Sequence, residues 1–235
     1  MKKRWIVLTA LLAALAIGAG ALNAMGYDAQ EQARAAMTSS EGVEVRPLKG
    51  GETAFVPQAA EKGLIFYPGG LVEHTAYAPL MEALAQEGWL CVLTQMPLEL
   101  AVLDMNAADG LQEQFPEVDS WAIGGHSLGG AMAASYAAGH AEDFDALVLL
   151  AAYSTADLTS SGLDVISLYG SEDGVLNREK YADYRKNLPD DAREIIIEGG
   201  NHAGFGDYGP QRGDGSASIS PQEQIRRTVS ELIKE

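Results

Sequence analysis

The stretch SWAIGGHSLGGAMAAS, residues 120–135, joins a short apolar run to an alanine-rich run through a cluster of glycines. The first part has the length and apolar character of a buried strand, and the second favours a helix. Gly125 and Gly129 flank Ser127 at two residues on either side, so the chain can turn sharply and leave the serine side chain clear of the strand. Phosphate-binding turns are also rich in glycine, but no lysine follows here as in a P-loop, and the G-x-G-x-x-G spacing is not met. The pattern favours Ser127 as a nucleophile.

Strand-like and helix-like segments alternate on both sides of this stretch. Residues 43–57 indicate two short strands around a turn at 49–51. Further strands are expected at 63–70, 89–97, 120–127, 144–154, 164–173 and 193–200, and helices at 76–88, 101–116, 128–143, 177–189 and 220–235. Nearly continuous apolar strands that alternate with helices predict an α/β fold, with a mostly parallel sheet covered by helices on both faces. Ligands bind beyond the carboxyl ends of such strands, so chemistry is expected in the loops that follow them.

The motif GHSLG at 125–129, with a strand before it and a helix after it, resembles the nucleophile elbow of the α/β-hydrolase superfamily. The resemblance extends over nearly everything from Val43 onward. It is to small, lid-less members of the dienelactone hydrolase and esterase type. In many relatives a cap follows the strand after the nucleophile helix, but only the twelve residues 153–164 are available for one here. We therefore expect an open site.

A serine hydroxyl needs a base that accepts its proton. The sequence contains four histidines, and His202 alone follows the last expected strand, on the same sheet edge as Ser127. His126 directly precedes the serine and is expected to point away from it. His202 is therefore the predicted general base, which accepts the serine proton and returns it to the leaving group.

The acid that orients the base is expected after a strand that lies between Ser127 and His202 in the sequence. Asp173 follows the penultimate strand and gives the order Ser, Asp, His that is typical of the superfamily. Glu172 is its immediate neighbour. Asp157, in the loop after the preceding strand, is the alternative, because some members of the superfamily carry the acid there.

The resemblance also implies a pair of backbone N–H donors for an oxyanion. One is the N–H of Leu128, directly after the nucleophile, and the other comes from the loop after the first parallel strand, where relatives commonly carry a His-Gly pair. Pro68 stands in place of that histidine. The second donor is therefore left open between Gly70 and Leu71.

The amino-terminal sequence has the features of an export signal. Basic residues at 2–4 precede an apolar run at 5–26, and the positive-inside rule places the rest of the chain outside the cytoplasmic membrane. Ala19 and Ala21 form an A-x-A pattern that suits a cleaved signal peptide, whereas the length of the run suits a transmembrane anchor. Residues 1–27 are thus expected to form a signal peptide or a hydrophobic anchor helix.

The remaining chain is expected to divide into a stalk or linker at 28–42 and a hydrolase domain at 43–235. A net charge of −17 argues against nucleic acid as a partner, and contact with a membrane is expected through the amino-terminal segment only. The single cysteine, Cys91, lies in an apolar run and is interpreted as buried and inert. Phe205 and Tyr208, in a glycine-rich loop after the predicted base, are candidate pocket walls on a solvated rim.

Together these features predict an exported serine hydrolase that cleaves an ester or a related acyl bond of a small molecule through an acyl-enzyme. The mechanism requires neither a metal nor another cofactor. The alternative is a catalytically silent relative that serves as a binding module at the cell surface. A silent relative usually lacks a member of the triad, whereas Ser127, Asp173 and His202 are all present.

Overall fold

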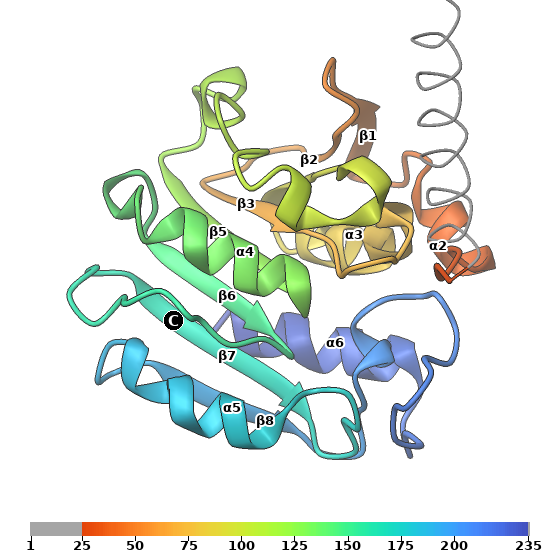
Figure 1. Ribbon diagram of the computed structural model, residues 1–235. Helices are drawn as coiled ribbons and strands as arrows, with labels where there is room; N and C mark the ends of the chain where they lie inside the picture. The colour runs from red at the N-terminus through yellow and green to blue at the C-terminus, as the bar shows by residue number, and fades with distance from the viewer. Residues whose placement is uncertain (1–24, 235) are drawn as a thin grey trace, which may run out of the picture.

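The structure is a computed structural model that describes residues 25–234 (Figure 1). The segment predicted to be a signal peptide or anchor helix, residues 1–27, lies outside the described residues except for its last three. Over residues 25–234, no helix combines the length and the apolar character needed to cross a membrane.

An eight-stranded sheet forms the centre of the domain, with the strand order β1-β2-β4-β3-β5-β6-β7-β8. The strands are β1 (Val43–Pro47), β2 (Thr53–Pro57), β3 (Lys62–Tyr67), β4 (Trp89–Leu93), β5 (Ser120–His126), β6 (Ala146–Leu150), β7 (Asp164–Gly170) and β8 (Arg193–Ile197). Pairing is antiparallel from β1 to β2 and from β2 to β4, and parallel from β4 through β8. The predicted α/β fold class and the hairpin at 43–57 are confirmed.

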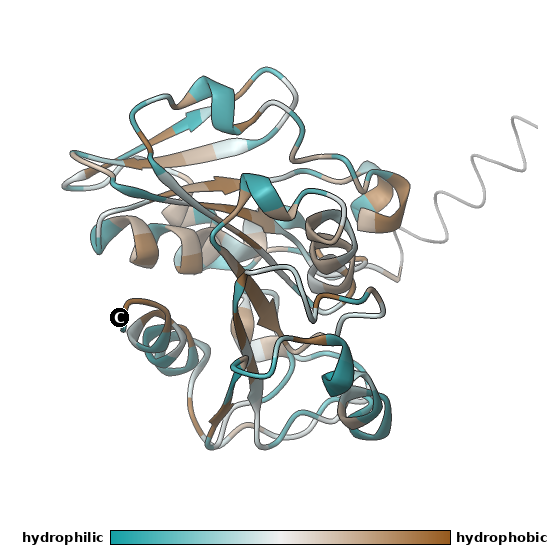
Figure 2. Cartoon of the chain, turned by 90° about the vertical axis from the view of Figure 1, so that its left-hand side faces the viewer, coloured by the Kyte–Doolittle hydropathy of each residue, from teal (hydrophilic) through white to brown (hydrophobic). Residues whose placement is uncertain are grey.

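Helices cover both faces of this sheet (Figure 1). The α-helices are α2 (Glu31–Ala36), α3 (Ala78–Gln86), α4 (Leu128–Ala137), α5 (Arg178–Tyr184) and α6 (Pro221–Leu232). Short 3₁₀ turns are η1 (His74–Tyr77), η2 (Pro97–Glu99), η3 (Ala101–Leu103), η4 (Gln112–Gln114), η5 (Ala141–Asp143), η6 (Arg185–Asn187) and η7 (Ala203–Phe205). One apolar core lies between the sheet and α2, α3 and α6, and a second lies under α4 and the connection from β4 to β5. The apolar strands run between these helical layers (Figure 2).

The helix predicted at 101–116 is wrong, because this connection contains only the turns η3 and η4. A buried tyrosine provides the physical reason. The hydroxyl of Tyr67 donates to the carbonyl of Met105 at 2.7 Å and accepts from the N–H of Ala108 at 3.0 Å, so these groups do not take helical partners. Gly110, with φ of +71°, adopts a left-handed conformation that interrupts a helix.

Residues 28–42 pack against the domain that follows them. Ala33 and Ala36 on α2 are buried in the first core, and the N–H of Ala33 donates to the side chain of Asp207 at 2.9 Å. On the far side of the sheet, the connection from β6 to β7 at 151–163 contains neither helix nor strand, in keeping with the expected absence of a cap there.

Candidate active site

Ser127 stands on the predicted sharp turn between β5 and α4. Its φ of 52° and ψ of −120° lie outside the conformations that side-chain-bearing residues ordinarily adopt. The two flanking glycines make this turn possible, because a Cβ on Gly125 would lie 2.5 Å from the carbonyl oxygen of Tyr67, and one on Gly129 would lie 2.2 Å from that of Pro68. The turn therefore packs against the end of β3 with no room for side chains at either glycine.

Unusual backbone conformations gather around this turn. Besides Ser127, the non-glycine residues with positive φ are Leu71, Leu98, Glu99 and Ala151. Ala151 follows β6, and the carbonyl of Glu99 accepts a hydrogen bond of 2.8 Å from the N–H of Leu71, in the loop after β3. Such conformations cost about 1–3 kcal/mol each and persist where packing imposes them, most often at functional sites. In this protein they mark the carboxyl edge of the central strands.

His202 and Asp173 form a buried pair beyond the ends of β7 and β8. The Nδ1 of His202 lies 2.8 Å from the Oδ2 of Asp173, and both residues are buried. The other carboxylate oxygen, Oδ1, accepts from the N–H groups of Val175 and Leu176 at 2.9 and 2.8 Å. Burial opposes ionisation of Asp173, but the hydrogen bonds from His202 and the backbone outweigh it and hold the pKa of the carboxyl below its ordinary value. The pair thus joins a carboxylate to an oriented imidazole.

The two other acids considered from the sequence lie elsewhere. Asp157 is exposed, and its carboxylate accepts hydrogen bonds from the backbone and hydroxyl of Thr159 in its own loop. Glu172 is also exposed and accepts from the hydroxyl of Ser171. The geometry therefore favours Asp173 as the partner of His202.

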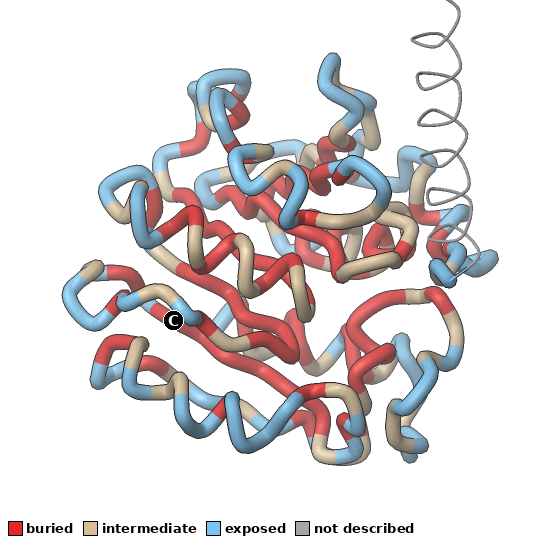
Figure 3. Tube along the Cα trace, viewed as in Figure 1, coloured by how far each residue is buried: buried red, intermediate tan, exposed pale blue. Residues whose placement is uncertain are grey.

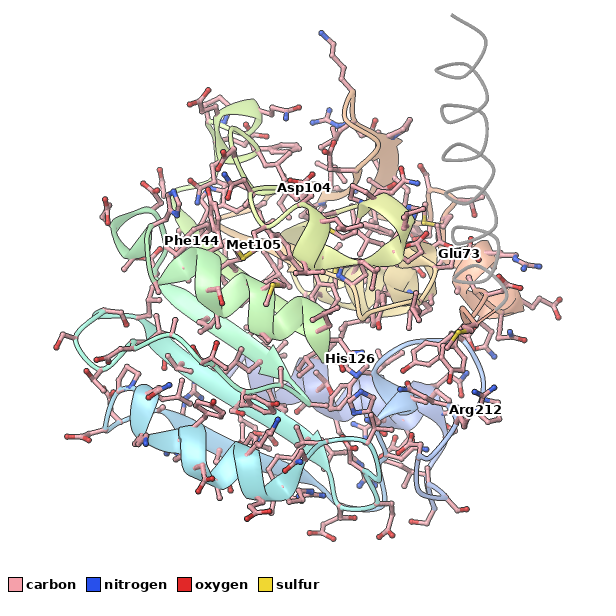
Figure 4. The ribbon with its side chains drawn as sticks, in the orientation of Figure 1. Glu73, Asp104, Met105, His126, Phe144 and Arg212 are labelled. Carbon is pink, nitrogen blue, oxygen red and sulfur yellow. The ribbon has the colours of Figure 1, made fainter. Side chains whose placement is uncertain are left out.

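The second ring nitrogen of His202, Nε2, is buried and has no hydrogen-bond partner among the described residues. With Nδ1 held by Asp173, Nε2 is the nitrogen that can accept a proton. It belongs to a ring that packs on His126, the residue next to Ser127, with 4.5 Å between the ring centroids. His202 and Ser127 therefore reach the same small region of the sheet edge (Figure 4 labels His126 there).

Sequence reasoning missed the environment of His126. Its Nδ1 lies 2.8 Å from the hydroxyl of Tyr77, which also accepts from the N–H of Gly69 at 3.1 Å. Burial, followed by the charge of His202, holds the pKa of His126 well below its ordinary value. A neutral His126 does not repel a proton that arrives on His202. Tyr77 and His126 are 49 residues apart, so no local pattern could have linked them.

The backbone of the loop after β3 distinguishes the two candidates for the second oxyanion donor. The N–H of Leu71 donates to Glu99, and that of Gly69 donates to Tyr77. The N–H of Gly70 has no acceptor among the described residues. A Cβ at Gly70 would lie 2.9 Å from the side chain of Leu128, so the two residues are in close contact. Leu128 is the first residue of α4, where N–H groups lack helical partners. The geometry therefore favours Gly70 over Leu71.

The carboxyl group of Glu99 lies beside this loop and is half-buried. Its Oε2 has no hydrogen-bond partner among residues 25–234. Burial, reinforced by the charge of Glu73, raises the pKa of Glu99 to about 7. The site is thus bordered by a carboxyl group that titrates near neutral pH.

The loop after His202 differs from the expected solvated rim in its first half. Phe205 and Tyr208 are buried in the core, Phe205 against the ring of His126, so they do not form pocket walls. The second half is partly or fully exposed, and Figure 3 shows this change away from burial along the loop. In that half, the carboxylate of Asp214 accepts hydrogen bonds from four backbone N–H groups, those of Gly174, His202, Ala203 and Gly215, at 2.8–3.2 Å. Asp214 thereby ties the loop of the base to the loop of the acid.

The described residues offer little for metal or thiol chemistry. Across residues 25–234, no three His, Cys, Asp or Glu side chains are grouped so that they could hold a metal ion. Cys91 is buried, and burial raises the pKa of its thiol.

A mostly parallel sheet with a serine on a strained strand-to-helix turn is the architecture of the α/β-hydrolase class. The chain belongs to the alpha/beta hydrolase family, whose model matches residues 63–226. A comparison with curated proteins finds no match.

Solved structures share this fold at low sequence identity. Carboxyl esterase 2 from the fungus Tuber melanosporum is 13% identical, with a TM-score of 0.59 over 82% of this chain and 85% of that one. Dienelactone hydrolase from Anabaena variabilis is 16% identical, with a TM-score of 0.56 over 80% and 96%. Est1E from Butyrivibrio proteoclasticus is 14% identical, with a TM-score of 0.55 over 82% and 97%. The expected resemblance to small hydrolases of this type is confirmed.

Proposed function

We propose that this hydrolase cleaves an ester or a related acyl bond of a small molecule through an acyl-enzyme on Ser127. The observation that carries the proposal is the buried pair of His202 and Asp173, which leaves Nε2 of His202 as the proton acceptor. The ring of His202 packs on His126, the residue directly before the serine that is held on a strained turn. The esterase and dienelactone hydrolase structures that share the fold support an acyl substrate.

In the proposed reaction, the Ser127 Oγ attacks the carbonyl carbon while its proton passes to the Nε2 of His202. Asp173 stabilises the resulting imidazolium through Nδ1. The backbone N–H groups of Leu128 and Gly70 donate to the oxyanion, each worth about 3 kcal/mol in the transition state. Collapse of the intermediate breaks the carbon–oxygen bond, and the departing alcohol takes the proton from His202. Water then repeats the sequence on the acyl-enzyme and releases the acid.

The alternative is a silent relative that binds ligands at the cell surface. The two are separated by reaction with a fluorophosphonate probe, which modifies an activated serine. We expect wild-type protein to label at Ser127 and the Ser127→Ala variant to remain unlabelled. Folded wild-type protein that neither labels nor hydrolyses any acyl ester would support the binding module.

We also propose that the domain lies outside the cytoplasmic membrane, with residues 1–27 as a signal peptide or an anchor. The basic residues at 2–4 followed by the apolar run support this orientation. Cell fractionation and sequencing of the mature amino terminus test it. A full-length chain in the cytosol would contradict export, and a new amino terminus near Leu22 or Met25 would identify a cleaved signal.

A further inference from the structure

An apolar patch is exposed on the connection from β4 to β5. Of the seven large hydrophobic side chains that are exposed within residues 25–234, four lie between residues 98 and 105, and they are 41–56% exposed. We call them the apolar patch: Leu98, Val102, Leu103 and Met105. Scattered exposed hydrophobic residues are common, whereas a contiguous group indicates a surface that is covered in use.

The backbone links the patch directly to the candidate active site. Leu71, next to the oxyanion candidate Gly70, is held by the carbonyl of Glu99, the neighbour of Leu98 in the patch. A Cβ at Gly70 would lie 3.8 Å from the side chain of Leu100. Figure 4 labels Met105 and its neighbour Asp104, which lie above His126 in that view. The patch therefore adjoins the loop that shapes the mouth of the site.

The start of the described chain is attached to the same loop. The N–H of Tyr27 donates to the carbonyl of Leu71 at 2.8 Å, and the N–H of Glu73 donates to the carbonyl of Tyr27 at 2.9 Å. Tyr27 also forms a parallel bridge with Val72. The apolar run of the sequence ends at Gly26, the residue before Tyr27. One residue spans at most about 3.6 Å, so no slack separates that run from the loop.

From these contacts we infer that the apolar run is retained as an anchor, and that the apolar patch rests on the bilayer that holds it. The mouth of the site then faces the membrane surface, and the substrates are acyl esters that partition into that surface. This inference rests on the proposed hydrolase function and adds the class of substrate. It also extends the membrane contact beyond the amino-terminal segment, to which the sequence alone confines it.

The chemistry of the patch determines which lipid surface fits it. The chain carries a net charge of −17, and Asp104 lies within the patch itself. Anionic headgroups would repel such a surface, whereas apolar contact with a zwitterionic bilayer carries no such penalty. The anchor, and not charge attraction, keeps the apolar patch close to the bilayer, because a short tether gives the patch a high effective concentration at the membrane surface. Phosphatidylcholine is therefore the probe lipid.

The first experiment measures the depth of the patch in the membrane. The full chain is reconstituted in phosphatidylcholine vesicles with an environment-sensitive fluorophore on Leu103→Cys. The native Cys91 is buried, so the unaltered chain serves as the labelling blank. The matched control is Ser160→Cys, exposed on the connection that returns from β6 to the opposite sheet edge. Lipid-borne doxyl groups should quench the label at 103 at least threefold more than the label at 160.

Equal quenching at both positions would overturn the inference. So would isolation of mature protein that lacks the apolar run. A label at 103 that is already shielded in detergent, together with a dimeric mass, would also overturn the inference. It would show that a second copy of the chain, and not the bilayer, covers the apolar patch.

The second experiment separates docking from catalysis. The triple variant Val102→Ser, Leu103→Ser, Met105→Ser should hydrolyse a soluble short-chain ester within twofold of wild type, but an ester lipid in vesicles at least fivefold more slowly. The control, Ile196→Ser with Ile233→Ser, removes exposed apolar side chains elsewhere and should change neither rate. Equal loss on both substrates in the triple variant would overturn the inference. If wild-type protein hydrolyses no ester at all, the proposed function fails, while the label at 103 still reports docking.

Discussion

Replacement of Asp173 by Asn probes the proposed mechanism at one atom. The Oδ1 of Asp173 accepts from two backbone N–H groups, and its Oδ2 accepts from the Nδ1 of His202. An asparagine keeps its carbonyl oxygen toward the backbone donors, because its NH₂ group would otherwise face them donor to donor. That NH₂ group then faces Nδ1, which must become an acceptor. The proton moves to Nε2, and the imidazole can no longer accept the proton of Ser127.

We expect kcat for a soluble p-nitrophenyl ester to fall about 10⁴-fold in Asp173→Asn, equivalent to about 5.5 kcal/mol of transition-state stabilisation. Fluorophosphonate labelling of Ser127 should slow in parallel. Asp157→Asn is the matched control, because Asp157 is exposed and accepts hydrogen bonds within its own loop. The activity of this variant should stay within about twofold of wild type. Circular dichroism checks that both variants fold. A larger loss in Asp157→Asn than in Asp173→Asn would refute the assignment of the acid.

Three further outcomes are expected. Ser127→Ala and His202→Ala should each lower ester turnover by several orders of magnitude, because triad members act as a unit, and normal turnover in His202→Ala would remove it as the base. Tyr77→Phe leaves the N–H of Gly69 without its acceptor, so chemical denaturation should show a loss of about 1–3 kcal/mol in unfolding free energy, and unchanged stability would disprove that role. The pKa of Glu99 is raised in the folded state to about 7, so wild-type stability should decrease as pH rises from about 4.5 to 7. Glu99→Gln should remove roughly 1 kcal/mol of that decrease after allowance for solvent screening, as measured by urea unfolding at pH 5 and pH 8, and parallel pH profiles would refute it.

Sequence patterns predicted the sheet because its central strands are almost continuously apolar, and this pattern can be recognised without knowledge of the neighbouring strands. The turn at Ser127 could also be predicted from the sequence, since local geometry requires its two flanking glycines. The helix expected at 101–116 failed because the decisive contact is made by Tyr67, a residue far away in the sequence. Local patterns carry no record of such contacts.

In the candidate site, too, features set by the local sequence could be predicted, and features set by contacts between distant residues could not. The order of Ser127, Asp173 and His202 along the chain could be predicted, because each follows a strand of one parallel sheet. The choice of Gly70 over Leu71 could not, since it depends on the hydrogen bond that Glu99 accepts across the loop. The packing of His126 on the base likewise arises only in three dimensions.

The four hydrogen bonds at Asp214 bear on how this protein can be engineered. They make an irregular loop as intolerant of cutting as a strand, because a break near Asp214 would unpair the backbone on both sides of the acid and base. Affinity tags, inserted domains and new termini from circular permutation therefore do not belong at 209–215, although this segment is partly exposed and rich in glycine. The exposed positions Thr159, Ser160 and Gly162, in the connection from β6 to β7 on the far edge of the sheet, are better sites for them. A library that randomises surface loops should recover active clones there and lose them around Asp214.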